Sequence, residues 1–149
     1  GSIKQYDVNE QPRISINIAM EYAKDRDRIA LQYVSDFADI FDLGNGWIVE
    51  SIQHWDRLDW AVVLCYLNFL SSFSDSHIVR KFGKKCAEKI RKDSQDIAVR
   101  FAEQKQPENM LHELLHFDSE LKAADINPGT TADLTAASIL VYFLQENNL

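Results

Sequence analysis

The sequence predicts an all-α fold, a single-domain bundle of several helices with its last helix buried. Apolar residues recur three and four positions apart along most of the chain, which is the spacing of one helix face. Glycine and proline are scarce, at five and three of 149 residues, which disfavours a fold of many short strands. The length and the 46% hydrophobic content suffice for one core. We expect residues 3–149 to form one domain, with Gly1 and Ser2 a remnant of expression.

The first helices follow a polar lead-in over residues 3–14. Ser15 suits the N-cap of a helix that runs to about Lys24, and Asp25 suits the cap of a second helix over about 26–42. Three acids, Asp27, Asp36 and Asp39, recur in this second helix. Because Asp36 and Asp39 are three positions apart, we expect them to face the same side.

The middle of the chain predicts two more helices. Gly44-Asn45-Gly46 is expected to break the chain before a helix that starts at Trp47. A short bend at residues 56–59 leads to the apolar segment Trp60 to Leu70. We interpret that segment as a buried helix, because it shows neither the alternation of a strand nor a partner strand.

Three helices complete a total of seven. One long helix is expected over about 76–104. Pro107 opens the next at its favoured first position, and its leucines are expected to face inward. These are Leu111, Leu114, Leu115 and Leu121. The last helix follows Asn127-Pro128-Gly129, a predicted tight turn in which glycine takes a positive φ, with Thr130 or Thr131 as N-cap. From Leu134 to Leu144 it is apolar on nearly every side and should lie inside the fold.

Charge and cysteine content exclude several functions. The net charge of −7 argues against general nucleic-acid binding, which needs a basic surface. The longest apolar run, Trp60 to Leu67, is far shorter than the ~20 residues of a membrane span. Cys65 and Cys86 are spaced like neither a zinc site nor a paired motif, so we expect two buried thiols in a reducing cytoplasm.

One short motif imitates a zinc protease. His112-Glu113-Leu114-Leu115-His116 fits the pattern H-E-x-x-H. The extended form fails, because Ser119 stands at its glycine position and Lys122 at its last histidine position. A catalytic zinc needs a third protein ligand, and we therefore expect no zinc hydrolase.

Two groups of charged residues are candidates for phosphate chemistry. Seven cations between Arg80 and Lys92 face the single acid Glu88. Lysines at this spacing often form a solvated helix face, but Arg80 and Lys81 are expected near a helix start, where they would suit phosphate oxygens. The acids Asp27, Asp36 and Asp39 could hold Mg²⁺ beside phosphates, act as a general base, or merely keep a face soluble.

The turn before the last helix has two readings. Backbone amides at a helix start can hold a phosphate, and Asp133 would lie in the first turn. The alternative is a capped core helix that binds nothing.

Three blocks of sequence resemble one family. They are Asn127-Pro128-Gly129-Thr130-Thr131-Ala132-Asp133-Leu134-Thr135-Ala136-Ala137-Ser138, the stretch from Arg26 to Phe41, and Asp75-Ser76-His77-Ile78-Val79-Arg80-Lys81-Phe82-Gly83. In this order they resemble the triphosphoribosyl-dephospho-CoA synthases, which make the prosthetic-group precursor of citrate lyase and malonate decarboxylase. The resemblance spans roughly residues 7 to 144 and covers the second half of the family's usual length.

The resemblance implies a transferase of cofactor biosynthesis. In the family, the 2′-hydroxyl of 3′-dephospho-CoA attacks C1 of the ATP ribose, and adenine leaves. It implies ATP with Mg²⁺, Arg80 and Lys81 as phosphate clamps, and an amide cradle. The cradle comprises Asn127, Gly129, Thr130 and Thr131. Asp39 or Asp133 would be the metal ligand or the base.

The alternative is a non-catalytic helical module that binds a nucleotide or pairs with another chain. That chain would be a separate protein carrying the N-terminal half, or a second copy. Tyr66 and Ser74, where the family would have histidine and proline, favour this alternative.

Overall fold

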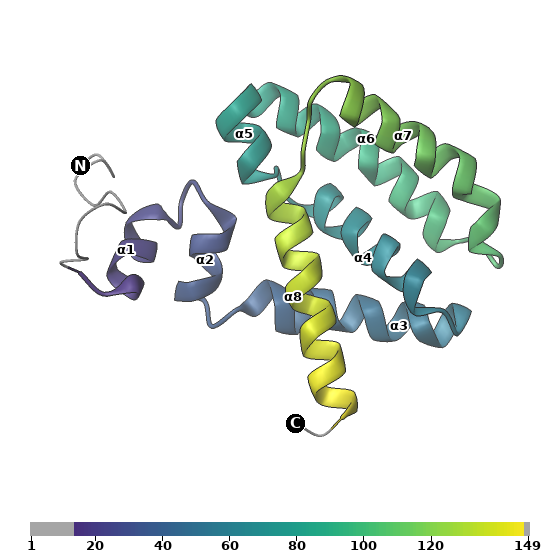
Figure 1. Cartoon of the computed structure of the whole chain (residues 1–149), viewed down its shortest axis with the longest axis horizontal. Coiled ribbons are helices and arrows are strands. Elements are labelled where there is room, and N and C mark those ends of the chain that lie inside the picture. Colours follow the sequence, from purple (N-terminus) through teal and green to yellow (C-terminus); the bar gives the residue numbers. More distant parts are fainter. Residues whose placement is uncertain (1–13, 148–149) are drawn as a thin grey trace.

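The computed structural model describes residues 14–147, and every regular element among them is helical (Figure 1). The predicted fold class is therefore confirmed, with eight α-helices in this part of the chain where the sequence predicted seven. A π-helical turn, η2, precedes α3, and a 3₁₀ turn, η3, precedes α7. The elements are α1 (Ile16–Ala23), α2 (Arg28–Val34), η2 (Asp39–Gly44), α3 (Asn45–Trp55), α4 (Leu58–Ser72), α5 (Ser76–Phe82), α6 (Lys84–Ala102), η3 (Pro107–Met110), α7 (Leu111–Ala123) and α8 (Gly129–Glu146).

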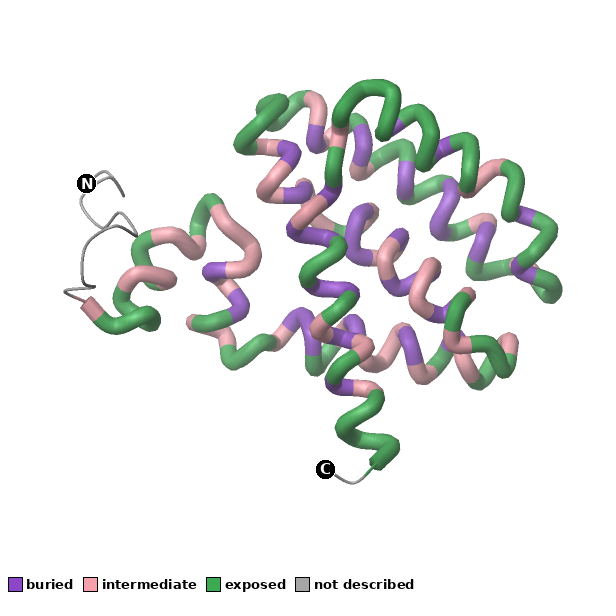
Figure 2. The backbone as a smooth tube through the Cα atoms, viewed as in Figure 1, coloured by how far each residue is buried: buried purple, intermediate pink, exposed green. Residues whose placement is uncertain are grey.

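Helix α4 is the centre of the molecule. It contributes Leu67 to a core cluster with α6 and α7, and Phe69 to a second cluster with η2, α3 and α8. Figure 2 shows buried positions recurring along α4. The predicted buried helix from Trp60 to Leu70 is thus confirmed. Within residues 14–147 no single helix is long and apolar enough to cross a membrane, although α4 and α5 taken together, with a 54° bend between them, reach that length and composition.

The predicted helix over 26–42 is wrong. Asp27, not Asp25, caps α2, and the chain leaves the helix at Ser35. Asp36 and Phe37 then take positive φ values of 53° and 59°, which a continuous right-handed helix cannot contain. Asp36 is consequently exposed while Asp39 is buried, so the two acids do not share a face.

Gly44 does not break the chain, because η2 runs directly into α3. A Cβ atom on Gly44 would lie 2.0 Å from Ser138 Oγ and 2.7 Å from Phe69 Cζ. The glycine is therefore required where η2 packs closely against α8 and α4. The predicted chain break at Gly44 is therefore wrong. The sequence shows the glycine but not the close packing against Ser138 and Phe69 that requires it.

The predicted helix over 76–104 is two helices. Gly83 has a φ of 87°, a conformation that glycine adopts easily, and it separates α5 from α6. Lys81 therefore belongs to a different helix from Lys85 and Lys89.

The two last helices are less buried than predicted. On α7, Leu121 is buried and Leu114 is half-buried, whereas Leu111 and Leu115 are 45% and 58% exposed. Helix α8 packs one side against the core through Leu134 and Ser138. Its other side is open, and Leu140 is 59% exposed. A helix whose residues are apolar on nearly every side, such as α8, is thus not necessarily buried on every side.

Candidate functional site

Asp75 joins the starts of two helices. Its Oδ1 accepts hydrogen bonds from the backbone N–H of His77 and Ile78, at 2.9 and 3.1 Å, and so caps α5. Its Oδ2 accepts from the N–H and the hydroxyl of Thr131, both at 2.8 Å, near the start of α8. The side chain is buried, with Asp75 only 3% exposed. One carboxylate therefore fixes α5 and α8 side by side.

Ser76 and Asp27 bring a third helix start to the same place. The Ser76 Oγ accepts a hydrogen bond from Arg28 N at 2.8 Å, which ties the first residue of α2 to α5. Asp27 caps α2 through Oδ1, which accepts from Ile29 N at 2.9 Å and Ala30 N at 3.4 Å. The first turns of α2, α5 and α8 are thus held together.

A hollow of about 300 Å³ lies where these three helices begin, and we call it the first hollow. It contains two carboxylates, one guanidinium and one imidazole, together with residues from the first turns of the helices. Its lining is Asp27, Ile29, Ser76, His77, Arg80, Asn127, Gly129, Thr130, Ala132 and Asp133.

The first hollow offers donors for an anion. Arg80 is exposed, and its Nη2 lies 3.2 Å from His77 Nδ1. The backbone N–H of Thr130 makes no hydrogen bond to any residue in the described range 14–147. It belongs to the first turn of α8, an 18-residue helix whose N-terminus carries partial positive charge. A guanidinium and an amide at a helix start are the donors that phosphate oxygens accept from.

The turn before α8 differs from the prediction. Pro128 has φ −74° and ψ 67°, and Gly129 N donates to Asn127 O at 2.8 Å, which is an inverse γ-turn. Pro128 occupies the N-cap position instead of Thr130 or Thr131, and Gly129 does not have a positive φ. A Cβ on Gly129 would lie 3.2 Å from His77 Nδ1. The glycine therefore leaves room for His77 and does not supply an unusual backbone conformation.

Most of the residues predicted from sequence gather in the first hollow. Arg80, Asn127, Gly129, Thr130 and Asp133 all line it.

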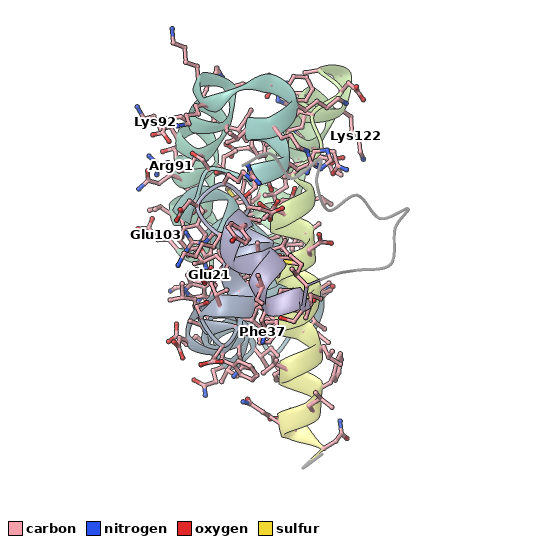
Figure 3. The ribbon with its side chains drawn as sticks, turned by 90° about the vertical axis from the view of Figure 1, so that its left-hand side faces the viewer. Glu21, Phe37, Arg91, Lys92, Glu103 and Lys122 are labelled. Atoms are coloured by element: carbon pink, nitrogen blue, oxygen red, sulfur yellow. The ribbon has the colours of Figure 1, made fainter. Side chains whose placement is uncertain are left out.

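Two predicted phosphate ligands lie elsewhere. Thr131 is 3% exposed and already donates both its N–H and its hydroxyl to Asp75. The Lys81 ammonium contacts Asp125 Oδ2 at 2.7 Å, outside the first hollow. This hydrogen bond, together with the charge of Lys81, lowers the pKa of the Asp125 carboxyl. Lys92 projects from α6 on the side of the molecule away from α8 (Figure 3).

Asp39 is also outside the first hollow. Its two carboxylate oxygens accept from Arg28, Nε at 2.8 Å and Nη2 at 3.0 Å, and Oδ2 also accepts from Gln32 Nε2 at 2.5 Å. The Asp39 N–H donates to Gln32 Oε1 at 3.1 Å. The carboxylate therefore joins η2 to α2, and Asp39 does not line the first hollow with Asp133.

Sequence reasoning missed Ser76 and His77 as parts of the site. Both lie between Asp75 and Arg80 in one of the matched blocks. The spacing of His77 and Arg80, three positions apart on a helix, places them on one face and was the available signal. The two departures from the family pattern lie outside the first hollow: Tyr66 packs against the core, and the Ser74 hydroxyl donates to Glu88 Oε2 at 3.3 Å.

The zinc-protease motif lies on α7, away from the site. His112 and His116 are exposed, and His116 Nδ1 lies 3.4 Å from Glu120 Oε2. Across residues 14–147, no group of three or more histidine, cysteine or acidic side chains is arranged to hold a metal ion.

The fold and the hollow define a class: an all-α protein with a small charged site that suits a phosphate group. The chain belongs to the CitG family, ATP:dephospho-CoA triphosphoribosyl transferase, whose family model matches residues 1–149. The resemblance predicted from the three sequence blocks is thereby confirmed.

A solved structure from Archaeoglobus fulgidus, which carries the name triphosphoribosyl-dephospho-CoA synthase, is similar at 30% sequence identity and a TM-score of 0.64. The match covers 95% of this chain and 54% of that one, so this chain spans about half the length of that relative. Which half it represents stays a prediction. Comparison with curated proteins gave no match.

Proposed function

We propose that this chain supplies the triphosphate-binding part of a transferase that moves the triphosphoribosyl group of ATP to 3′-dephospho-CoA or a related acceptor and releases adenine. The observation that carries the proposal is the meeting of Arg80, Thr130 at the start of α8 and two carboxylates in the first hollow of a CitG-family chain. Family membership supports the reaction, and the hollow supports the place where the triphosphate binds.

Arg80 and the start of α8 are the proposed anion ligands. The guanidinium is charged at every pH of interest and presents several N–H donors to phosphate oxygens. The Thr130 N–H carries no net charge. It would donate a directed hydrogen bond to a phosphate oxygen, and the positive end of the helix dipole would strengthen that bond. The hydrogen bonds of Asp75 hold these donors in place before a ligand arrives, which lowers the ordering cost of binding.

Mg²⁺ fits this donor set. It usually takes one or two protein carboxylates, keeps several waters and binds substrate phosphates directly, so it needs no cluster of three protein ligands. Asp133, which lines the first hollow as Arg80 does, would hold it. When bound, Mg²⁺ would neutralise part of the triphosphate charge.

Asp27 is the proposed proton acceptor. In the transfer, the acceptor 2′-hydroxyl oxygen forms a bond to C1 of the ATP ribose, and the bond from C1 to adenine N9 breaks with its electron pair leaving on adenine. The hydroxyl proton goes to a carboxylate, and adenine finally leaves protonated at nitrogen. Asp27 has Oδ1 engaged in capping α2, while Oδ2 makes no hydrogen bond to the described residues and remains for the proton. Nearby carboxylates would also stabilise an oxocarbenium-like transition state.

Calorimetric titration with ATP and Mg²⁺ tests the anion site. Arg80→Ala should weaken binding by about tenfold or more, because one charge-assisted contact is lost. Lys81→Ala is the matched control, because the Lys81 ammonium is next to Arg80 in sequence but lies outside the first hollow and is paired with Asp125. An equal loss in both variants, or none in Arg80→Ala, would contradict the proposed site.

A non-catalytic nucleotide-binding module is the second candidate. The observation in its favour is that Tyr66 and Ser74 depart from the pattern of the family blocks. Under this candidate ATP still binds, but no adenine is released unless the remaining part of the family length is supplied as a separate protein. Measuring adenine release with and without that part separates the two.

A further inference from the structure

A second hollow, of about 660 Å³, adjoins the first and shares Asp27 and Ser76 with it. We propose that this second hollow binds the acceptor, a nucleoside diphosphate ester such as 3′-dephospho-CoA. The inference rests on the proposed function and goes beyond it by giving the acceptor a place. The lining of the second hollow includes Arg26, Asp27, Phe73, Ser76, Val79 and Lys84.

The lining combines apolar side chains with cations, as such an acceptor requires. Leu31, Phe73 and Val79 contribute apolar surface for the adenine or pantetheine parts. The Phe73 ring is held in place by Arg28, whose guanidinium carbon lies 3.4 Å from the ring centroid.

Two cations of the second hollow are available for a diphosphate. Arg28 is paired with Asp39, and Lys24 with Glu21. By contrast, Arg26 and Lys84 make no ion pair with any residue in the range 14–147. A diphosphate can engage these two cations without breaking any ion pair between the described residues.

The shared wall suits a transfer between two ligands. Reacting atoms must approach to about 3–3.5 Å, so donor and acceptor sites must touch. The Ser76 Oγ accepts from Arg28 N, which leaves its O–H free to donate to a ligand on either side. Asp27 lines both hollows and can therefore reach a hydroxyl that enters from the second toward a ribose in the first.

A third hollow, of about 540 Å³, is a poorer acceptor site. It is lined by Lys84, Lys85, Glu88, Lys89, Lys92 and Asp93 on α6 alone and shares no residue with the first hollow. A diphosphate bound there would gain charge contacts, but its hydroxyl would have no common wall with the ATP site.

Calorimetric titration with 3′-dephospho-CoA, and separately with ATP and Mg²⁺, tests the inference. The double variant Arg26→Glu/Lys84→Glu should weaken 3′-dephospho-CoA binding by about tenfold or more and leave ATP binding within about twofold. The control Lys85→Glu/Lys89→Glu makes the same change of charge in side chains that line only the third hollow, and should leave both affinities nearly unchanged. Thermal melting of each variant confirms that the fold is retained.

Each other outcome is decisive. Equal loss of 3′-dephospho-CoA binding in the control variant, or loss in Arg80→Ala but not in the Arg26/Lys84 variant, would overturn the inference. If ATP binds and 3′-dephospho-CoA does not, the second hollow is not the acceptor site, while the proposed function of the first hollow stands. If 3′-dephospho-CoA binds as expected and ATP does not, the proposed triphosphate site fails instead and the second hollow is supported.

Discussion

The proposed function gives the two carboxylate oxygens of Asp27 different tasks, and one substitution separates them. Asp27→Asn keeps an oxygen that can accept from Ile29 N and Ala30 N, because asparagine is as good an N-cap as aspartate. It removes the proposed proton acceptor. We expect adenine release to fall by about 100-fold or more, within the usual range for a lost general base, while the melting temperature changes little.

Asp42→Asn is the matched control for Asp27. Asp42 is exposed and lines neither the first nor the second hollow, so turnover should stay within a few-fold of the unmodified protein. Adenine release is measured under conditions in which the unmodified protein is active. Where activity needs it, the part of the family's length that this chain does not span is added as a separate protein. Normal turnover in Asp27→Asn would remove this residue from the reaction.

Asp75 should matter more for stability than any other polar residue of the site. Asp75→Asn would place an NH₂ group opposite either the Thr131 donors or the α5 amides, since one amide oxygen cannot serve both sets. A buried donor left facing a donor costs about 2–3 kcal/mol of unfolding free energy. Urea unfolding measures the loss, and titration with ATP and Mg²⁺ should show weaker binding, because Arg80 and α8 lose their common anchor.

Thr131→Val gives the scale for that loss. It removes only the hydroxyl donor and should cost about 1 kcal/mol. A loss in Asp75→Asn no larger than that in Thr131→Val would show that the double cap contributes little.

At the level of helices, two neighbouring glycines should respond oppositely to alanine. Gly44→Ala forces a Cβ against Ser138 and Phe69 and should cost about 1–3 kcal/mol through overpacking. Gly46→Ala meets no atom within 4 Å in α3 and should stabilise by about 0.5–1 kcal/mol, because alanine favours a helix. Urea unfolding of both variants checks this. Adding Ser138→Ala to Gly44→Ala should recover part of the loss, and equal effects at the two glycines would contradict the close packing.

Glu88 links α6 to the end of α4 and should give a pH-dependent contribution. Its carboxylate accepts from Arg91, which in turn donates to Ser71 O at 3.1 Å. The hydrogen bond from Arg91 is the main cause that lowers the Glu88 pKa from 4.5 to about 2. Because the folded-state pKa is lowered, the contribution is present above pH 4.5 and is lost as the pH falls toward 2.

Glu88→Gln tests this link. Its melting temperature should lie below that of the unmodified protein at neutral pH, and the gap should close between pH 4.5 and 2. The gap should also shrink in high salt, since the pair is partly exposed. Glu103→Gln, whose carboxylate makes no ion pair within the described part of the chain, should show a smaller gap throughout. A gap for Glu88→Gln that is independent of pH would contradict the ion pair.

For the whole molecule, the two core clusters should unfold together because α4 belongs to both. Phe69 is 1% exposed and meets Trp47 edge-on at 5.0 Å, so Phe69→Ala should cost about 3–5 kcal/mol. Fluorescence of Trp47, with Trp55 and Trp60 replaced by Phe, should report the same midpoint as far-ultraviolet circular dichroism. Phe41→Ala is the control, since Phe41 is half exposed and its loss should change stability little. Two separate transitions would show that the clusters are independent.

Local signals were sufficient for much of this fold. The three-and-four spacing of apolar residues predicted an all-α protein and the buried helix α4, since a helix face repeats whatever it packs against. Ser15 predicted the start of α1, because an N-cap acts within its own first turn. The motif of residues 127–138 and the block at 75–83 likewise predicted five residues that line the first hollow, and they indicated the family.

What failed, or could not be predicted, depends on contacts between distant residues. The close approach at Gly44 and the room that Gly129 leaves for His77 each require a neighbour far along the chain. Asp39 and Asp133 looked equivalent in sequence, and only packing engaged Asp39 with Arg28. The double cap of Asp75 spans 56 positions. Propensity acts over a few residues, whereas a site made from the starts of three helices exists only once those helices have packed.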